Sequence, residues 1–253
     1  MVKILLCGCN GKMGRVISSC VRERNDCKII AGLDLCTETH FDYPVYPSFD
    51  QVDCEPDVIL DFSHVSVLSP LLAFALKKKT PSVLCSTGYS SGQVEEIHAA
   101  SSKIPLFFSG NMSLGINLLI ELSKKAAAVL GNQFDIEIIE KHHNQKIDAP
   151  SGTALMLADA VSSALSEVPM YEYNRHAQRK KRTKNEIGIH AVRGGTIVGE
   201  HEVLFAGHDE IISLTHIAQS KEVFATGSIN AAVFMDTCEA PGLYDMGDLL
   251  SAK

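Results

Sequence analysis

Two adjacent histidines and a lysine lie within five residues in the middle of the chain, at His142, His143 and Lys146. Histidine is the side chain whose ordinary pKa suits proton transfer near neutral pH, and a positioned acid or base typically contributes about 10²–10⁴ in rate. Lysine adds a positive charge that attracts an anionic group. The pattern therefore predicts an acid/base cluster that faces a negatively charged substrate.

The residues after this cluster mark the start of a helix, which we expect over 151–166. Pro150, Ser151 and Thr153 are typical of a first helical turn. The first N–H groups of a helix have no partner inside it, so those of Gly152 and Thr153 would bind an anion. Surface histidines and a metal site are the alternatives. No third ligand has a suitable spacing, so no metal is expected.

A glycine-rich turn near the N-terminus is a candidate dinucleotide site. The segment Gly8-Cys9-Asn10-Gly11-Lys12-Met13-Gly14 follows a first apolar run and precedes a helical pattern. Glycine permits a tight turn and a close approach of the backbone to a pyrophosphate, and the helix start adds N–H groups and a positive dipole end. Asp34, 20 residues after Gly14, stands where an acidic residue accepts ribose hydroxyls. The alternative is a tight turn without a ligand.

The residue after Asp34 bears on the choice between NADH and NADPH. Leu35 offers no positive charge to a 2′-phosphate, which favours NADH. Lys12 lies in the turn and could meet that phosphate, so NADPH stays open.

Strand and helix patterns alternate over the first 110 residues. Apolar runs predict strands at 3–7, 28–33, 58–61, 82–85 and 106–108. Helical periods follow the first and third of these runs. Such alternation predicts a Rossmann-type, doubly wound parallel sheet.

The pattern changes after about residue 113 and predicts a smaller α+β domain. Helices are expected at 115–130 and 151–166, and strands at 134–141, 188–193, 201–205 and 210–216. Strands clustered late in a chain favour a mixed or antiparallel sheet. A final helix at 224–238 is expected to pack on the first domain. We therefore expect a dinucleotide-binding domain at 1–112, completed by 220–253, and a substrate-binding and oligomerisation domain at 113–219.

Composition and charge exclude several kinds of partner. The net charge of −7 argues against nucleic acid. No apolar run is long enough for a membrane span, and the first one is too short for a secretory signal. Eight scattered cysteines without zinc spacing indicate free thiols in the cytoplasm. The basic stretch at 179–184 reads as a solvated, mobile loop; nuclear targeting, nucleic-acid binding and attraction of an acidic substrate are its alternatives.

The segment from Glu140 to Thr153, E-K-H-H-N-Q-K-I-D-A-P-S-G-T, resembles the long motif of the dihydrodipicolinate reductase family. The resemblance covers nearly the whole chain. It also includes Gly8–Gly14, Asp61–Ser63, Ser86–Gly88, Gly110–Asn117, Arg193–His201 and Gly242–Met246.

The resemblance implies an enzyme of diaminopimelate and lysine biosynthesis. It would reduce 4-hydroxy-tetrahydrodipicolinate or dihydrodipicolinate, a cyclic imine dicarboxylate, to tetrahydrodipicolinate by hydride transfer from NADH or NADPH and protonation of the enamine carbon. His142 would be the proton donor/acceptor and Lys146 the second donor. His143, Gly152 and Thr153 would hold the substrate carboxylates. The residues implied to line the dinucleotide are Gly8, Cys9, Asn10, Gly11, Lys12, Met13, Asp34, Cys85, Ser86, Thr87, Ser109, Gly110, Asn111 and Met112. A homotetramer assembled through the second-domain sheet is implied as well.

The chain departs from the family pattern at three places. Asn10 replaces a small residue, His64-Val65-Ser66-Val67 replaces an Arg and a Pro-Glu-Gly-like run, and Ser86 replaces a threonine. The competing interpretations are another two-domain dehydrogenase, acting on an amino acid such as aspartate, and a dinucleotide-binding protein without turnover. The histidines outside the cluster, including His201 and His216 in predicted strands, are expected to be structural or on the surface.

Overall fold

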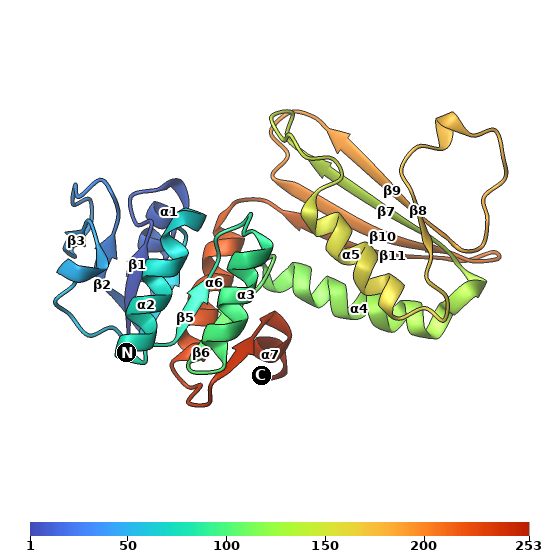
Figure 1. The fold of residues 1–253 in the computed structure, drawn as a ribbon. Helices are drawn as coiled ribbons and strands as arrows, with labels where there is room; N and C mark the ends of the chain where they lie inside the picture. Colours follow the sequence, from blue (N-terminus) through green and yellow to red (C-terminus); the bar gives the residue numbers. More distant parts are fainter. Residues whose placement is uncertain (253) are drawn as a thin grey trace. The chain divides into compact units, whose positions relative to one another are not determined.

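The chain forms two compact units in a computed structural model, which describes residues 1–252 apart from the side chain of Asn132. Unit 1 comprises Met1–Leu114 and the segment from Lys221 onward, and unit 2 comprises Gly115–Ser220 (Figure 1).

Unit 1 is built on a seven-stranded sheet in which every neighbouring pair is parallel, in the order β12-β6-β5-β4-β1-β2-β3. The strands are β1 (Val2–Cys7), β2 (Cys27–Leu33), β3 (Val45–Tyr46), β4 (Val58–Asp61), β5 (Ser82–Leu84), β6 (Pro105–Phe108) and β12 (Gly242–Tyr244). The predicted doubly wound parallel sheet is confirmed. The two edge strands were not predicted, because two or three residues carry no periodicity.

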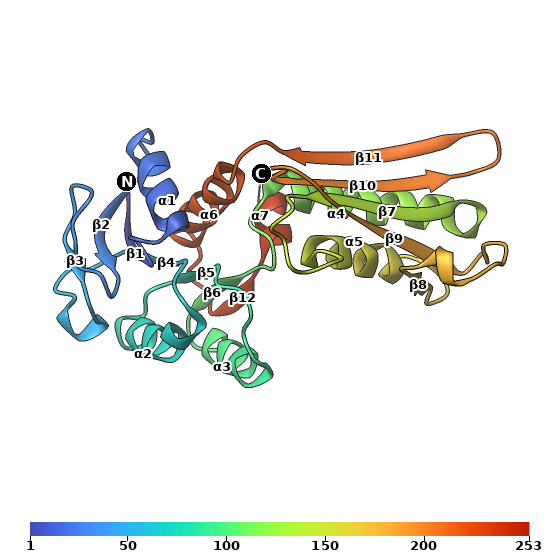
Figure 2. The same cartoon turned by 90° about the horizontal axis from the view of Figure 1, so that it is seen from above.

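Helices cover both faces of this sheet (Figure 2). They are α1 (Lys12–Arg22), α2 (Leu68–Lys78), α3 (Ser91–Ser101), α6 (Glu222–Met235) and α7 (Met246–Ser251). Helices α1, α6 and α7 share one apolar core with the sheet, and α2 and α3 share another on the opposite face. The prediction that the helix after residue 222 is the last was wrong, since β12 and α7 follow it.

The strand order reverses direction between β1 and β4, which lie side by side with Cys7 opposite Asp61. Loops that leave adjacent parallel strands on opposite faces create a crevice at such a switch point, where ligands of doubly wound proteins bind. Gly8 and Phe62 are the first residues of these two loops, so the glycine turn begins at the crevice.

Unit 2 is a five-stranded mixed sheet in the order β11-β10-β7-β9-β8, as the clustering of late strands predicted. Its strands are β7 (Asp135–His142), β8 (Met170–Glu172), β9 (Glu186–Arg193), β10 (Gly199–Ala206) and β11 (Ile211–Ala218). Helices α4 (Leu114–Leu130) and α5 (Gly152–Ser163) share one apolar core with β7, β9 and β10.

Strand β7 carries the acid/base cluster to its carboxyl end. Its side chains alternate between intermediate exposure and burial, with Ile136, Ile138, Glu140 and His142 on the buried side. Because strand side chains alternate with a period of two, Glu140 and His142 point to the same face as the apolar residues that contact α5.

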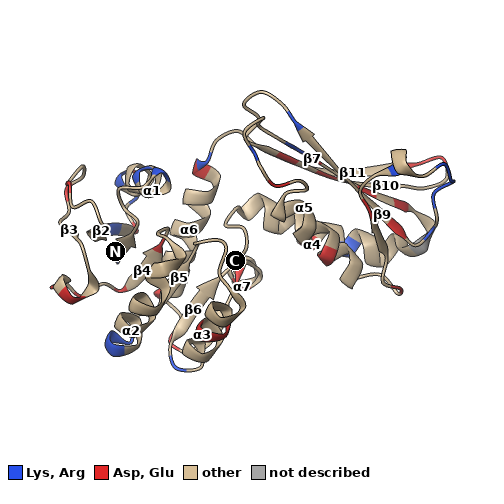
Figure 3. Cartoon of the chain, turned by 45° about the horizontal axis from the view of Figure 1, so that its top comes forward, with Lys and Arg blue, Asp and Glu red and all other residues tan. Residues whose placement is uncertain are grey.

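The basic stretch lies at the other end of β7 (Figure 3). Arg182 donates to Asp135 and Glu137 and to the carbonyl oxygen of Ile136, at the start of the strand. The expectation of a wholly solvated loop was wrong at Arg182, whose side chain is 16% exposed. Within unit 2 the loop is separated from His142 by the length of β7, which argues against attraction of substrate to that residue.

Candidate active site

The acid/base cluster spans three adjacent strands of unit 2. In the register of the sheet, Arg193 of β9 lies opposite His142 of β7, and His201 of β10 lies opposite Glu140. His142 Nδ1 is 2.6 Å from Glu140 Oε2. The His201 ring meets the His142 ring edge-on, with centroids 5.1 Å apart. The sheet thus gathers residues that are about 50 positions apart in sequence.

Glu140 is fully buried and its carboxylate is saturated with donors. Arg193 Nη1 and Nη2 each donate to one of its oxygens at 2.7 Å, and the Ser151 N–H donates at 3.0 Å. Burial by itself would raise the pKa of Glu140, but the hydrogen bonds from Arg193, His142 and Ser151 hold it below its usual value. The carboxylate is therefore ionised at neutral pH.

The contact with Glu140 assigns the nitrogens of His142. An ionised carboxylate only accepts, so Nδ1 carries the hydrogen and Nε2 is left for chemistry. Gly199 keeps the surroundings of Nε2 clear, since a Cβ at this position would lie 3.2 Å from that atom. His142 is 8% exposed, so the ring edge is largely shielded within the unit.

His201 is a second histidine of the cluster. The prediction that it is merely structural did not foresee its contact with the His142 ring. Its Nε2 lies 3.0 Å from Ser151 Oγ, which also caps α5 by accepting from the Ala154 N–H. Burial, with the neighbouring His142 as the next cause, lowers the pKa of His201 to about 4. His201 is thus a neutral ring packed against His142.

The low pKa of His201 predicts an acid-dependent loss of stability. In the unfolded chain the imidazole binds a proton as the pH falls below about 6.5, whereas the folded protein resists protonation down to about 4. Folding stability should therefore fall by about 3 kcal/mol between these pH values from this group alone. Urea unfolding of the wild type and of His201→Gln at several pH values checks this. Equal pH slopes for both proteins would contradict it.

Lys146 lies in the loop after β7 and is held by a neighbour. Its Nζ is 2.8 Å from Asp148 Oδ1, and this ammonium keeps the pKa of Asp148 below its usual value. The positive charge of Lys146 also lowers the pKa of His201, as the smallest of the causes. Lys146 therefore interacts electrostatically with the histidine cluster. His143 follows β7 directly and is partly exposed.

The N-terminus of α5 opens beside this loop. Ser151 is its N-cap, and Gly152 is exposed, with no atom within 4 Å of where a Cβ would stand. Thr153 is partly exposed in the same turn. The positive end of a helix dipole and a lysine in the preceding loop suit a carboxylate.

The glycine turn of unit 1 is dictated by close contacts. Gly8 has φ +76°, and a Cβ there would lie 2.5 Å from the Phe62 carbonyl oxygen. At Gly14 a Cβ would lie 2.2 Å from the Gly8 carbonyl oxygen. Gly11 is the N-cap of α1 and has an extended backbone that any residue can adopt. A side chain at this position is therefore limited by the space around it and not by the backbone conformation. These contacts make a cradle that fits a pyrophosphate at a helix N-terminus.

Asp34 follows β2 and is oriented by two main-chain donors. Its Oδ2 accepts from the Asn10 N–H at 2.9 Å and its Oδ1 from the Cys36 N–H at 3.2 Å. The Asn10 side chain in turn donates to the carbonyl oxygens of Cys36 and Glu38. Asn10, where the family pattern has a small residue, therefore ties the glycine turn to the loop after Asp34.

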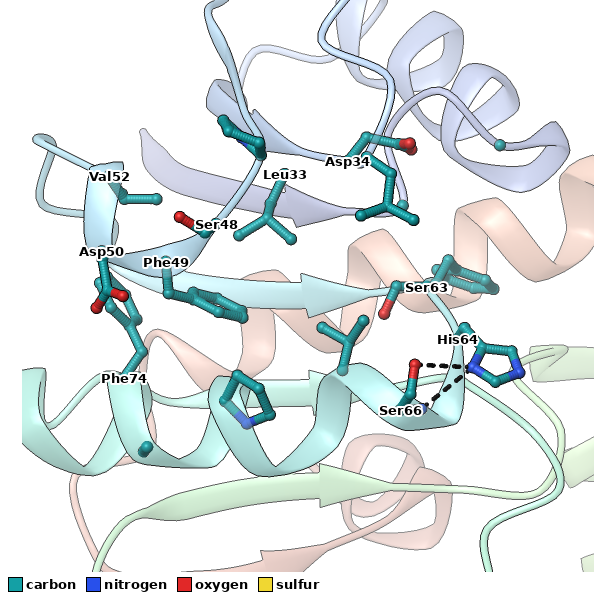
Figure 4. Close-up of a pocket in the computed structure, with 18 of the residues that line it drawn as sticks. Leu33, Asp34, Ser48, Phe49, Asp50, Val52, Ser63, His64, Ser66 and Phe74 are labelled. Atoms are coloured by element: carbon teal, nitrogen blue, oxygen red, sulfur yellow. Dashed lines mark hydrogen bonds between the residues drawn. The ribbon is translucent and has the colours of Figure 1, made fainter.

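A cavity of about 1070 Å³ in unit 1 brings three of the predicted cofactor residues together, namely Gly8, Gly11 and Asp34. Figure 4 shows Asp34 on one side of it and Ser63 and His64 on another. His64 Nδ1 accepts from the Ser66 N–H and so caps the short helix η2 (Val65–Val67). The departure from the family pattern at His64 thus places an imidazole in the cavity wall.

Four other predicted cofactor residues, Cys9, Cys85, Ser86 and Met112, have buried side chains. Cys9, Cys85 and Met112 point into the apolar core of unit 1. The Ser86 hydroxyl faces the buried Asp61 carboxylate at 2.9 Å. The remaining predicted residues do not line this cavity: Lys12 and Met13 begin α1, Thr87 follows β5, and Ser109, Gly110 and Asn111 follow β6.

Asp61 is a residue that sequence reasoning passed over, although its segment carries the resemblance. It ends β4 with 1% exposure and accepts from Ser63, Ser86 and Tyr89. Burial raises its pKa, while these hydrogen bonds oppose the rise. The side chain joins the ends of β4 and β5 at the crevice.

Residues 1–252, the part of the chain that the structure describes, lack two other kinds of feature. No three His, Cys, Asp or Glu side chains are placed to hold a metal ion. No helix among them is both long and apolar enough to cross a lipid bilayer.

Fold and site together define a two-domain, nicotinamide-dependent oxidoreductase with a histidine acid/base cluster in the second domain. The sequence models for the N-terminal and C-terminal parts of dihydrodipicolinate reductase match residues 2–112 and 115–250. The chain belongs to the dihydrodipicolinate reductase family.

Relatives called 4-hydroxy-tetrahydrodipicolinate reductase are similar over their whole length. One from Clostridium tetani is 49% identical over 252 residues, covering 100% of this chain and 98% of its own. One from Caldanaerobacter subterraneus is 50% identical over 250 residues, covering 99% and 98%.

Solved structures share the fold. A dipicolinate-bound dihydrodipicolinate reductase from Paenisporosarcina aligns with a TM-score of 0.81 at 24% identity, over 97% of both chains. An aspartate dehydrogenase from Thermotoga maritima aligns with a TM-score of 0.52 at 12% identity, over 91% of this chain and 95% of its own. The fold is thus shared with the competing class of dehydrogenase, and the family match separates the two.

Proposed function

We propose that this chain reduces 4-hydroxy-tetrahydrodipicolinate to tetrahydrodipicolinate with a nicotinamide dinucleotide, in diaminopimelate and lysine biosynthesis. The observation that carries the proposal is the His142–Glu140–Arg193 cluster at the end of β7, beside an open helix N-terminus and Lys146. The family match supports the same reaction.

The residues divide the work between the two units. The dinucleotide supplies a hydride when bound, and Gly8, Gly11 and Asp34 are the residues of unit 1 proposed to hold it. In unit 2, His142 Nε2 would deliver or remove the proton at the enamine carbon. Lys146 would be the second proton donor, and would exchange its contact with Asp148 for the substrate.

The two carboxylates of the substrate need positive groups and N–H donors. We assign them to His143, Gly152 and Thr153, at the start of α5, with the positive helix end behind them. The unit boundaries at Leu114 and Lys221 support a division into a dinucleotide-binding and a substrate-binding domain.

The assay that tests this function uses purified protein, NADH or NADPH, and enzymatically generated substrate. Oxidation of the cofactor with this substrate, and none with oxaloacetate and ammonia, is the expected result. Oxidation with oxaloacetate and ammonia would favour an aspartate dehydrogenase, and cofactor binding without turnover would favour a binding protein.

NADH is the proposed preferred cofactor. The Asp34 carboxylate stands at the end of β2, and Leu35, 94% exposed beside it, offers no cation to a 2′-phosphate. The guanidinium of Arg15, on α1, already has two partners within the protein. It donates to the Asn10 carbonyl oxygen and contacts His40, so it is engaged away from a 2′-phosphate.

Asp34→Ala should lower the ratio of kcat/KM for NADH to kcat/KM for NADPH by roughly tenfold or more. This is the change expected when one charged hydrogen-bonding group is lost. The neutral side chain no longer binds ribose hydroxyls or repels a phosphate. Steady-state kinetics with both cofactors measure the ratio, and Asp42→Ala is a control in the same unit. An unchanged ratio would show that Asp34 does not select the cofactor.

A homotetramer in the cytoplasm completes the proposal. Strand β11 exposes Ile211 and Ile217, and β9 exposes Val192, which suits assembly through this sheet. All eight cysteines are free, which suits a reducing compartment. Light scattering of the wild type and of Ile217→Lys tests the assembly, and an identical mass of a single chain for both would refute it.

A further inference from the structure

The buried Glu140–Arg193 ion pair has no part in the reaction as proposed so far. A fully buried carboxylate is costly unless it is paired and hydrogen-bonded. Here all four partners, the two Arg193 nitrogens, the Ser151 N–H and His142 Nδ1, lie within 3.0 Å. All four contacts favour the ionised carboxylate, and one of them comes from the His142 ring.

Arg193 also reaches the loop that carries Lys146. Its Nη2 donates to the Asp148 carbonyl oxygen at 2.6 Å, while the Asp148 carboxylate contacts the Lys146 ammonium at 2.8 Å. Past the ends of the two strands, the Gly194 N–H donates to the His142 carbonyl oxygen and the Asn144 N–H to that of Gly195. The backbone that follows His142 is thereby attached to the segment after Arg193.

We propose that Glu140 and Arg193 are a positioning pair: Glu140 keeps the hydrogen of His142 on Nδ1 and directs Nε2 outward, and Arg193 holds both Glu140 and the Lys146 loop. The inference rests on the proposed role of His142. The charged or titratable groups around the ring are Glu140 on its own strand, Arg193 on β9 and His201 on β10, and Lys146 acts on His201 from the following loop.

The wild-type protein offers a first test without any substitution. Long-range ¹H–¹⁵N spectra of the histidine rings report which nitrogen carries the hydrogen. A neutral His142 ring protonated at Nδ1 is the expected result. A ring protonated at Nε2 would overturn the proposal.

Kinetics of Glu140→Gln provide the second test. We expect kcat to fall by roughly 10–100-fold, as happens when a partner that orients a functional histidine is lost, while the KM for NADH stays unchanged. Because a negative charge beside the ring favours its protonated form, the basic limb of the kcat–pH profile should move to lower pH. A residue with a merely structural role would not move this limb.

Glu137→Gln is the matched control. Glu137 lies on the same strand and makes the same kind of network, with His190 Nε2 at 2.7 Å and with Arg182 and Arg175 at 3.1 Å. It contacts neither His142 nor the Lys146 loop, so its pH profile and kcat should remain those of the wild type. A loss equal to that of Glu140→Gln would mean that breaking either ion-pair network of β7 has this effect.

A double-mutant comparison separates this inference from the proposed function. If Glu140 acts through His142, then Glu140→Gln should cause no further loss in a His142→Gln background. Additive losses would refute the positioning role. Full activity of His142→Gln alone would instead refute the proposed function. Arg193→Lys, which keeps the charge but loses the two-pronged contact, should show a smaller loss of kcat and no shift of the basic limb, because Glu140 stays ionised. A wild-type kcat would exclude Arg193 from the pair.

Discussion

His142→Gln is expected to lower kcat by about 10²–10⁴, the contribution of a positioned general acid or base. Glutamine has a similar reach and can still donate a hydrogen bond to Glu140, but it cannot carry a proton to the reacting carbon. The affinity for NADH should remain unchanged, because the glycine turn and Asp34 belong to the other unit.

Steady-state turnover together with NADH fluorescence titration measures both quantities. His190→Gln is the matched control, since His190 of β9 also contacts a glutamate of β7 at 2.7 Å, but that glutamate is Glu137 and not the partner of His142. Turnover near the wild-type rate in His142→Gln would remove this histidine from the mechanism. A weakened NADH affinity with normal turnover would give it a different role.

Gly11→Val is expected to abolish measurable NADH binding with the fold intact. Gly11 lines the cavity and has an extended backbone that valine tolerates, and a Cβ would lie 3.2 Å from the Gly8 carbonyl oxygen. The added methyl groups would occupy the space of the pyrophosphate, which must approach the backbone closely.

Gly92→Val is the control for this substitution. It lies in the first turn of α3, in the same unit, and nothing stands within 4 Å of its Cβ position. Circular dichroism should report folded protein for both variants, and only Gly92→Val should bind NADH normally. Normal titration of Gly11→Val would show that the cavity does not hold the pyrophosphate at this turn.

Gly14→Ala, with its Cβ 2.2 Å from a carbonyl oxygen, should disturb the turn itself.

Local patterns account for the elements that the sequence predicted well. The parallel strands of unit 1 are continuous apolar runs, and α5 begins where Ser151 and Gly152 indicate. Helix α3 was missed even though Ser90 and Gln93 form a capping box, a readable start signal, because its apolar face is weak. Strand β12 was missed because three residues become a strand only when β6 is beside them.

The positions of the candidate residues along the chain were evident from their types and spacing, whereas their partners were not. Glu140 lay in the quoted motif, two residues before His142 on a strand, so the period of two already placed both on one face. Its charge, however, depends on Arg193, which is 53 residues away, and the surroundings of His142 depend on His201.

The sequence alone determined the fold class, the glycine turn and the identity of the histidine–lysine cluster, because these depend on interactions between near neighbours in the chain. Only the tertiary structure decided which nitrogen of His142 is available, that Glu140 is ionised and that His201 is neutral. The physical reason is that protonation depends on burial and on charges within a few ångströms. The register of the sheet, and not the distance along the sequence, sets both the burial of a group and the charges around it.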